Sequence, residues 1–309
     1  MEIEIENERC LTLKEAFDRF QRQNRIKNLA EETMTFYQNS YNNFVQFIGD
    51  EGTEISKIKK ETISNYILSL KEKIKDTSIN TYLRGIRTFL YYCMDENMLD
   101  KFKIKGIKVD KKKKEGYSTS QLKKLLNKPD MTSFGEYRNW VIIQMLLATG
   151  CRSKTLLNIK IKDIDLEECY VKFRKTKQKR EQILPLTSTM IDSLSEYLAI
   201  REGEKDDYLF PTVYGNQLSR SGLTNAIRTY NKKRGVSDTS IHKFRHTFSK
   251  IFMRNGGSIY ELKQILGHKE ISTTENYVNL LLEDYNEDFS TKNPLEIISG
   301  NKTEIKIKD

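Results

Sequence analysis

Apolar side chains recur at helical spacing through the first hundred residues. Four stretches repeat them every three or four positions, which predicts four amphipathic helices. The four stripes are Leu13, Ala16, Phe17 and Phe20; Met34, Tyr37, Tyr41, Phe44, Val45 and Ile48; Ile63, Tyr66, Ile67 and Leu70; and Ile79, Tyr82, Leu83, Ile86, Phe89, Leu90 and Cys93. Four such stripes predict a small helical bundle whose first helix begins near residue 12.

The helical pattern restarts near residue 117. STSQLKKLLNK and GEYRNWVIIQMLLATG predict two helices, and Gly150 is the expected end of the second. ECYVKFRKTKQKREQILPL alternates in the manner of two strands joined by a charged turn. Further helices are expected around residues 188–201, 219–233, 242–255, 258–266 and 273–283, the last with a capping box from Ser272 to Glu275. The fold class is therefore mainly α with a small antiparallel β-sheet.

A lysine-rich run separates the two helical regions. KFKIKGIKVDKKKK, residues 101–114, holds eight lysines and one aspartate. Like charges repel one another and resist compact folding, so the run predicts an extended linker. We therefore expect an N-terminal domain over residues 1–100, a basic linker over 101–116, a second domain over 117–290 and a C-terminal tail over 291–309.

The charge balance indicates a polyanionic partner. The chain has 53 lysines and arginines against 43 acidic residues, a net charge of +10, and each phosphate that such a surface neutralises releases a counterion. No apolar run is long enough to cross a membrane, and the polar, acidic N-terminus is unlike a secretory signal, which predicts a cytoplasmic protein. The four scattered cysteines have no C-x-x-C spacing, which argues against a disulfide framework or a zinc knuckle.

Four short motifs each hold a candidate phosphate ligand or nucleophile. Cleavage of a phosphodiester needs cations for the non-bridging oxygens, a nucleophile in line and an acid for the departing oxygen. Arginine suits the first task because it is always charged and donates bidentately. The motifs are LLATGCRS with Arg152, RKTKQKREQILPL with Lys177, HKFRHTF with His242 and Arg245, and LGHKEISTTENY with His268 and Tyr277.

The joint spacing of these motifs resembles the tyrosine recombinase, or phage integrase, family. In that family an arginine follows a helix that ends in T-G, an H-x-x-R comes about 90 residues later, and a tyrosine stands nine residues past the histidine of L-G-H. Here Arg152 precedes His242 by 90 residues and His268 precedes Tyr277 by nine. The resemblance implies the simple two-domain type, with a SAM-like core-binding four-helix bundle that binds DNA and an α-rich catalytic domain.

The resemblance also implies a role for each candidate. Arg152 and Arg245 would bind the non-bridging oxygens, and Tyr277 would be the nucleophile that forms a covalent phosphotyrosine. Lys177, eight residues before the proline of the second strand, would protonate the leaving 5′-oxygen, with Lys175 as its rival.

Histidine has the remaining implied roles. His242 would hydrogen-bond the phosphate and help manage the proton of the tyrosine, and His268 would donate to a non-bridging oxygen. His246 would tie down backbone. His242 and His246 at i, i+4 could together ligate zinc, but no acidic residue or cysteine stands at a spacing typical of a third zinc ligand. We expect no metal and no cofactor.

One position departs from the family pattern. An acidic residue is usual three positions after the first arginine, whereas Thr155 stands there. This affects the surroundings of Arg152 and Lys177 rather than the class of reaction. Asp163 or Asp165 are the candidates to compensate.

The implied activity is site-specific DNA recombination in a phage or mobile element. Each protomer would cover half of an inverted-repeat site, a dimer would occupy one site, and a tetramer would exchange strands through a Holliday junction, with accessory DNA-bending or directionality proteins. The tail after Tyr277 would dock on a neighbouring protomer or on its own domain. Candidate DNA contacts are Lys59, Lys60, Arg84, Arg87, Lys111, Lys112, Lys113, Lys114 and Lys175.

Three alternatives stay open from the sequence. A relaxing enzyme similar to type IB topoisomerases would share the chemistry but need no partner site. A catalytically silent DNA-binding regulator would keep the basic surface and not the nucleophile. A metal-dependent nuclease would lose its cleavage in EDTA.

Overall fold

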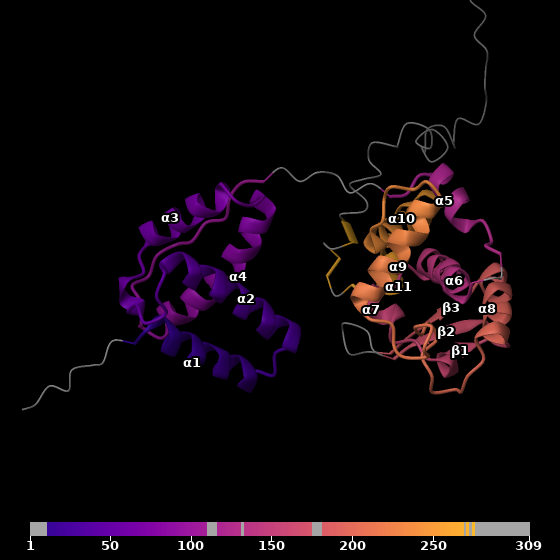
Figure 1. Cartoon of the computed structure of the whole chain (residues 1–309), viewed down its shortest axis with the longest axis horizontal. Coiled ribbons are helices and arrows are strands. Elements are labelled where there is room, and N and C mark those ends of the chain that lie inside the picture. The colour runs from indigo at the N-terminus through magenta and orange to yellow at the C-terminus, as the bar shows by residue number, and fades with distance from the viewer. Residues whose placement is uncertain are drawn as a thin grey trace, which may run out of the picture. The chain divides into compact units, whose positions relative to one another are not determined.

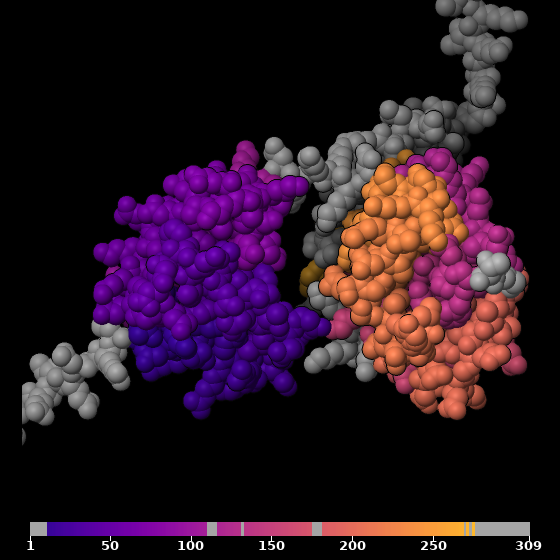
Figure 2. All heavy atoms as spheres, in the orientation of Figure 1, coloured from indigo at the N-terminus to yellow at the C-terminus, as the bar shows by residue number. Residues whose placement is uncertain are grey.

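The computed structural model divides the chain into two compact units, Met1–Lys112 and Lys113–Asp309 (Figure 1). It describes residues 11–109, 116–130, 133–174, 181–268, 270–271 and 274–275. Each unit is continuous in its own colours in the space-filling view of Figure 2, indigo to purple for the first and magenta to orange for the second. Each has its own hydrophobic core.

The first unit is a bundle of four helices, as the apolar stripes predict. Its core is aromatic: the ring of Phe17 stacks on that of Tyr41 at 3.9 Å between centroids, and Phe89 meets both edge-on. Thr12 starts the first helix through a capping box with Glu15. The helices are α1 (Leu13–Ile26), α2 (Glu31–Ile48), α3 (Lys60–Lys71) and α4 (Asp76–Asp95), with the short 3-10 helix η1 (Ile55–Lys57) before α3.

Helix α4 is the centre of this bundle and packs closely on α2. A Cβ atom at Gly85 would lie only 2.2 Å from Oγ of Ser40, so the two helix backbones approach as near as a glycine allows. Ser40 is buried and donates its hydroxyl to the carbonyl of Phe36, which satisfies it inside the contact. The close approach fixes α4 and the polar face that it turns outward.

The first part of the lysine-rich run lies against α4. The Asn80 amide donates to the carbonyl of Ile107 and accepts from its N–H, both at 2.8 Å. Ile104 is buried, and its N–H donates to the hydroxyl of Tyr91 at 3.2 Å. Residues 101–109 have neither helix nor strand and are docked on the first unit.

The second unit surrounds one buried helix, α6, with helices and a small antiparallel sheet. Gly150 ends α6 in the left-handed conformation, as predicted. The elements of this unit are α5 (Thr119–Leu126), α6 (Phe134–Thr149), α7 (Ser153–Leu156), η2 (Ile161–Asp163), β1 (Ile164–Asp165), β2 (Tyr170–Phe173), β3 (Gln182–Pro185), α8 (Ser188–Arg201), α9 (Arg220–Lys233), α10 (Ile241–Arg254) and α11 (Ile259–Leu266).

The sheet has the strand order β1-β2-β3. Tyr170 pairs with Pro185 and Phe173 pairs with Gln182, so β2 and β3 form the two arms of the predicted hairpin. The two-residue strand β1, which pairs Ile164 with Val171, was not predicted. The sequence 175–180 between the arms lies outside the described residues. Within the described part of the chain, no helix has the length and apolar character that a membrane span requires.

Candidate active site

The carbonyl groups at the C-terminal end of α11 gather side chains from distant parts of the second unit. The Leu266 carbonyl accepts from Nη2 of Arg245 at 2.8 Å and from Nη1 of Arg152 at 3.4 Å. The next carbonyl, that of Gly267, accepts from Arg152 at 3.5 Å. The end of a helix is its negative pole, so guanidinium groups are favourable there. Two of the predicted arginines are therefore brought together.

Arg245 is held inside the protein. It lies in the second turn of α10 and is only 6% exposed. Its Nη1 donates to the carbonyl of Gly150 at 2.8 Å, while its Nη2 donates to that of Leu266. Two fixed carbonyls define the plane of the guanidinium before any substrate arrives. Burial of a cation is costly, and these contacts offset part of that cost.

His268 completes the cluster. Its Nε2 lies 2.7 Å from Nη2 of Arg245, and its Nδ1 lies 2.9 Å from the hydroxyl of Thr274. A guanidinium can only donate, so Nε2 accepts and the proton of the neutral ring belongs on Nδ1, from which it is donated to Thr274. Burial, together with the charges of Arg245 and Arg152, lowers the pKa of His268 from 6.5 to about 4. The imidazole is thus neutral at pH 7.

This geometry bears on the implied role of His268. A ring nitrogen that accepts from Arg245 has no proton to donate to a phosphate oxygen. Donation to the substrate therefore requires the proton to move to Nε2 and the contact with Arg245 to open. In the arrangement observed, His268 orients Arg245.

Arg152 depends on the tight turn between α6 and α7. Gly150 has φ +59, and a Cβ atom there would lie 2.5 Å from the ring of Phe248 and 2.9 Å from Leu266. Only glycine meets both demands. The turn places Arg152 at the N-cap of α7, half-buried, with its guanidinium at the end of α11.

The other predicted histidines lie on α10. His242 is in the first turn of the helix and is exposed, one turn before Arg245. His246 is half-buried, and its role stays a prediction. Seven site residues proposed from the sequence lie outside the described residues: Tyr277, Lys177, Lys175, Lys111, Lys112, Lys113 and Lys114.

The carboxylates named as substitutes for the one missing at Thr155 serve the sheet. Thr155 is buried in α7. Asp163 is buried, accepts from the N–H of Lys160 at 3.0 Å and forms an ion pair with Arg174. Asp165 accepts from the amides of the turn that follows β1. These contacts stabilise η2 and the strands.

Two residues of this region were not predicted. Thr274 is fully buried and accepts from His268. The side-chain amide of Gln182, at the start of β3, donates to the carbonyls of Gln264 and Ile265, both at 2.8 Å. Threonine and glutamine carry no functional signal by residue type, and the contacts of Gln182 reach main-chain atoms more than 80 residues away.

No group of three or more His, Cys, Asp or Glu side chains suited to hold a metal occurs among the residues that the structure describes. His242 and His246 thus acquire no third ligand of these types there. The expectation that the chain needs no metal stays a prediction.

Comparison with known proteins agrees with the fold and with the family resemblance. Residues 117–283 match the phage integrase family, and residues 17–97 match the phage integrase N-terminal SAM-like domain. Tyrosine recombinase XerD of Staphylococcus haemolyticus is 28% identical over 265 residues, which cover 82% of this chain and 90% of that protein. Tyrosine recombinase XerA of Saccharolobus solfataricus is 29% identical over 277 residues, 85% of this chain and 88% of that protein.

A solved structure has the same fold. A lambda integrase fragment, crystallised as a dimer bound to a core site, superposes with a TM-score of 0.72 at 15% identity, covering 86% of this chain and 95% of that one. The chain belongs to the phage integrase family. Within that family it is a site-specific DNA recombinase of the tyrosine type, and it is similar over most of its length to recombinases of the Xer group.

Proposed function

We propose that this recombinase cleaves and rejoins DNA through a 3′-phosphotyrosine intermediate. The phenolic oxygen of Tyr277 would attack the scissile phosphorus, the bond to the 5′-oxygen would break, and Lys177 would give that oxygen its proton. Arg152 and Arg245 would bind the non-bridging oxygens as negative charge builds on them. Rejoining reverses these steps with a 5′-hydroxyl as the nucleophile, so the energy of the broken bond is kept in the protein–DNA linkage.

The observation that supports this proposal is the meeting of Arg152, Arg245 and His268 at the end of α11. The three residues are separated by as many as 116 positions in the chain, yet both arginines donate to the Leu266 carbonyl and one contacts the imidazole. Burial and the charges of the two arginines together lower the pKa of His268. Such an electropositive cluster suits the binding of a phosphate.

His242 would complete the phosphate contacts. It is exposed in the first turn of α10, whose N-cap residue Ser240 makes no side-chain capping bond. The positive pole of the helix favours an anion at that end. His242 would hydrogen-bond the phosphate there and take part in moving the proton of Tyr277.

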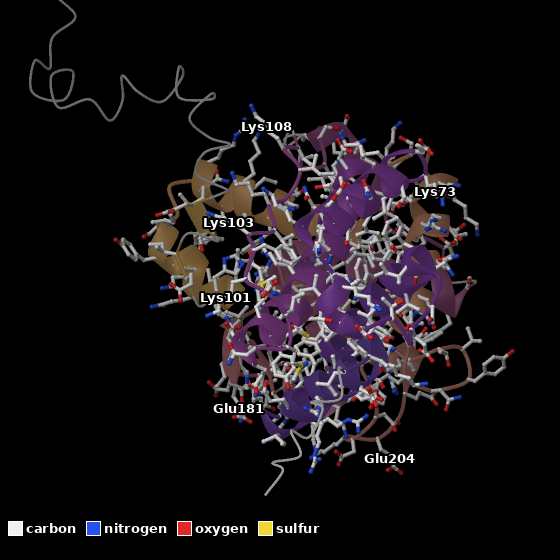
Figure 3. All side chains as sticks on the ribbon, turned by 90° about the vertical axis from the view of Figure 1, so that its left-hand side faces the viewer. Lys73, Lys101, Lys103, Lys108, Glu181 and Glu204 are labelled. Atoms are coloured by element: carbon white, nitrogen blue, oxygen red, sulfur yellow. The ribbon has the colours of Figure 1, made fainter. Side chains whose placement is uncertain are left out.

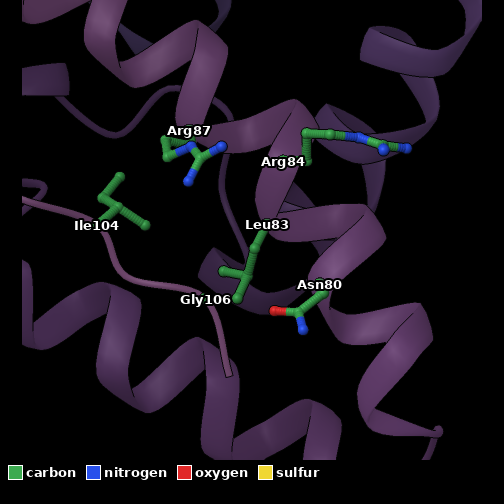
Figure 4. Close-up of a pocket in the computed structure, with 6 residues that line it drawn as sticks. All are labelled: Asn80, Leu83, Arg84, Arg87, Ile104 and Gly106. Atoms are coloured by element: carbon green, nitrogen blue, oxygen red, sulfur yellow. The ribbon is translucent and has the colours of Figure 1, made fainter. Parts of the chain in front are cut away.

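The first unit would bind the DNA backbone through α4 and the start of α3. Arg84 and Arg87 are exposed on α4 and line a pocket of about 260 Å³, together with Asn80, Leu83, Ile104 and Gly106 (Figure 4). Lys59 and Lys60 are exposed at the N-terminus of α3. The pocket on α4 combines two cations with a side-chain amide, and the start of α3 combines two cations with the N–H groups of a helix N-terminus. Both kinds of donor suit phosphate oxygens.

The docked segment 101–109 would add to this surface. Its lysines are exposed while Ile104 is buried beneath them. Lys101, Lys103 and Lys108 are labelled along one side of the unit in Figure 3. Lysines 111–114, predicted as DNA contacts, follow directly in the sequence.

The assembly would be a dimer on each inverted-repeat site and a tetramer when two sites meet. Exchange needs two duplexes to be cut, one strand in each, and each new 5′-hydroxyl must attack the phosphotyrosine of the other duplex. Four protomers therefore act in two pairs, and a Holliday junction separates the two rounds. Accessory proteins would set the direction, because the bonds broken and formed are of the same kind.

The decisive experiment traps the covalent intermediate. The protein is incubated with a nicked duplex of its recombination site, from which the released end diffuses away. We expect a protein–DNA adduct that resists denaturant, forms in EDTA and is absent from Tyr277→Phe. Tyr285→Phe is the matched control and should form the adduct normally. Absence of any adduct with the wild-type protein on its own site would overturn the proposal.

A further inference from the structure

Gln182 connects the β-hairpin to the arginine cluster. It is the first residue of β3, and its Nε2 donates to two successive carbonyls in the last turn of α11, those of Gln264 and Ile265. The two contacts are equally short, at 2.8 Å. Carbonyl oxygens in the last turn of a helix lack the usual i+4 partner within the helix. The Gln264 carbonyl also accepts from the N–H of Gly267 at 3.0 Å, and Gln182 adds a side-chain donor to it and to the Ile265 carbonyl.

The carbonyls bound by Gln182 are directly followed by those that bind the arginines. Along the chain, the carbonyls of residues 264 and 265 accept from Gln182, that of Leu266 accepts from Arg245 and Arg152, and that of Gly267 accepts from Arg152. His268 comes next. The last turn of α11 is therefore a common support for β3 and for the phosphate-binding cluster.

The opposite arm of the hairpin is fixed independently. Arg174, directly after β2, forms an ion pair with Asp163, whose side chain is only 1% exposed. Lys172 and Glu181 form a further ion pair at 3.1 Å across the two arms. Gln182 thus ties this braced hairpin to α11.

We infer that Gln182 is a positioning residue for DNA cleavage, which holds β3 at a fixed distance from Arg152, Arg245 and His268. Lys177 stands five residues before Gln182 in the chain. This inference rests on the proposed function, in which Lys177 protonates the leaving 5′-oxygen. Loss of the Gln182 contacts would then impair mainly the transfer of that proton.

A sulfur substitution at the leaving group tests this role. An alcohol leaves poorly without a proton, whereas a thiol ionises near pH 8 to 9 and leaves as the thiolate. Single-turnover cleavage is measured on two nicked duplexes that differ only in the bridging 5′-atom, oxygen or sulfur. The variants are Gln182→Ala, the isosteric Gln182→Glu, which lacks the two donors, and Lys177→Ala as the reference.

Gln217→Ala is the matched control. The Gln217 amide also donates to a main-chain carbonyl, that of Leu157 at 3.1 Å, and to the Asn158 side chain. The Gln217→Ala variant therefore loses a similar side-chain contact at a place away from α11. Thermal unfolding of each variant reports on the fold.

We expect both Gln182 variants to cleave the oxygen substrate roughly 10- to 100-fold more slowly than wild type, a partial loss of the roughly 100- to 10,000-fold that general acid catalysis supplies, and the sulfur substrate within a few-fold of wild type. Gln217→Ala should cleave both at wild-type rates. If sulfur rescues Lys177→Ala but not the Gln182 variants, or if the variants cleave oxygen normally, the positioning role is wrong. If sulfur fails to rescue Lys177→Ala, the proposed acid itself is wrong, and the inference falls with it.

Discussion

Nη2 of Arg245 lies 2.7 Å from Nε2 of His268, and the contact is buried. A neutral imidazole thus accepts from a guanidinium and helps to hold it in place. The partner on the far side of the ring, Thr274, is buried too. The relationship makes the protonation of His268 and the orientation of Arg245 depend on each other.

This dependence predicts that stability decreases as the pH falls from 6.5 to 4. In that window the unfolded chain protonates His268, whose usual pKa is 6.5, whereas the folded protein, with a pKa of about 4, does not. The unfolded state then binds more protons, so the free energy of unfolding decreases as the pH decreases, by as much as about 3 kcal/mol. Below pH 4 both states are protonated and this contribution changes no further.

Urea unfolding at a series of pH values measures the effect. His268→Gln cannot titrate, so its free energy of unfolding should fall less steeply than that of the wild type between pH 6.5 and 4. Equal slopes for the two proteins would show that His268 is not responsible.

Arg245→Lys should slow strand cleavage by on the order of 100- to 1,000-fold. A lysine keeps the charge but lacks the fork that contacts Gly150, Leu266 and His268. Single-turnover cleavage of the nicked site measures the rate. Arg254→Lys, exposed at the end of the same helix, is the control and should cleave at the wild-type rate; comparable rates for the two variants would contradict the assigned role.

Gly150→Ala should lower the free energy of unfolding by about 2 kcal/mol or more. The positive φ alone costs an alanine roughly 1 kcal/mol, and its Cβ would overlap Phe248 and Leu266. Gly235, at φ +66 with nothing within 4 Å of the added Cβ, is the matched control. Chemical unfolding of both variants separates conformational strain from overlap. Similar decreases in the free energy of unfolding for Gly150→Ala and Gly235→Ala would mean that the side chains around Gly150 rearrange at little cost.

Arg84→Gln and Arg87→Gln should weaken binding to duplex DNA of any sequence. Each lost phosphate contact lowers the slope of log Kd against log salt concentration by about 1. Fluorescence anisotropy at several salt concentrations measures both quantities. Lys14→Gln is the control, because Lys14 is already paired with Glu51 at 2.9 Å. An unchanged salt slope in the arginine variants would place the DNA elsewhere on the first unit.

The sequence predicts the helices of this protein well because each buries a periodic stripe. Residues such as Phe17, Phe44 and Phe89 lie where the spacing places them, in the core of the first unit. Gly150 is predictable as a helix end because a glycine follows the long apolar stretch there. The arginines and His268 were selected by the spacing of their motifs, and the structure brings these three together.

Other features leave no periodic trace. Strand β1 is two residues long, too short to show alternation. The docking of residues 101–109 depends on Ile104 and Ile107, whose signal is hidden among lysines. The contacts of Gln182 depend on main-chain carbonyls that only the tertiary fold brings near. Contacts between residues so far apart in the chain depend on the tertiary fold and not on the local sequence.

The two ends of the predicted linker belong to different units. Asn80 binds Ile107 on the first unit, while the N–H of Tyr117 donates to the hydroxyl of Thr247 at 2.7 Å. Thr247 lies on α10, two residues after Arg245. A chimaera that exchanges the first unit for that of another recombinase must therefore be joined between residues 109 and 116. A junction at residue 100 would separate the first unit from its buried Ile104. A junction beyond residue 117 would disturb the contact with the helix that carries Arg245.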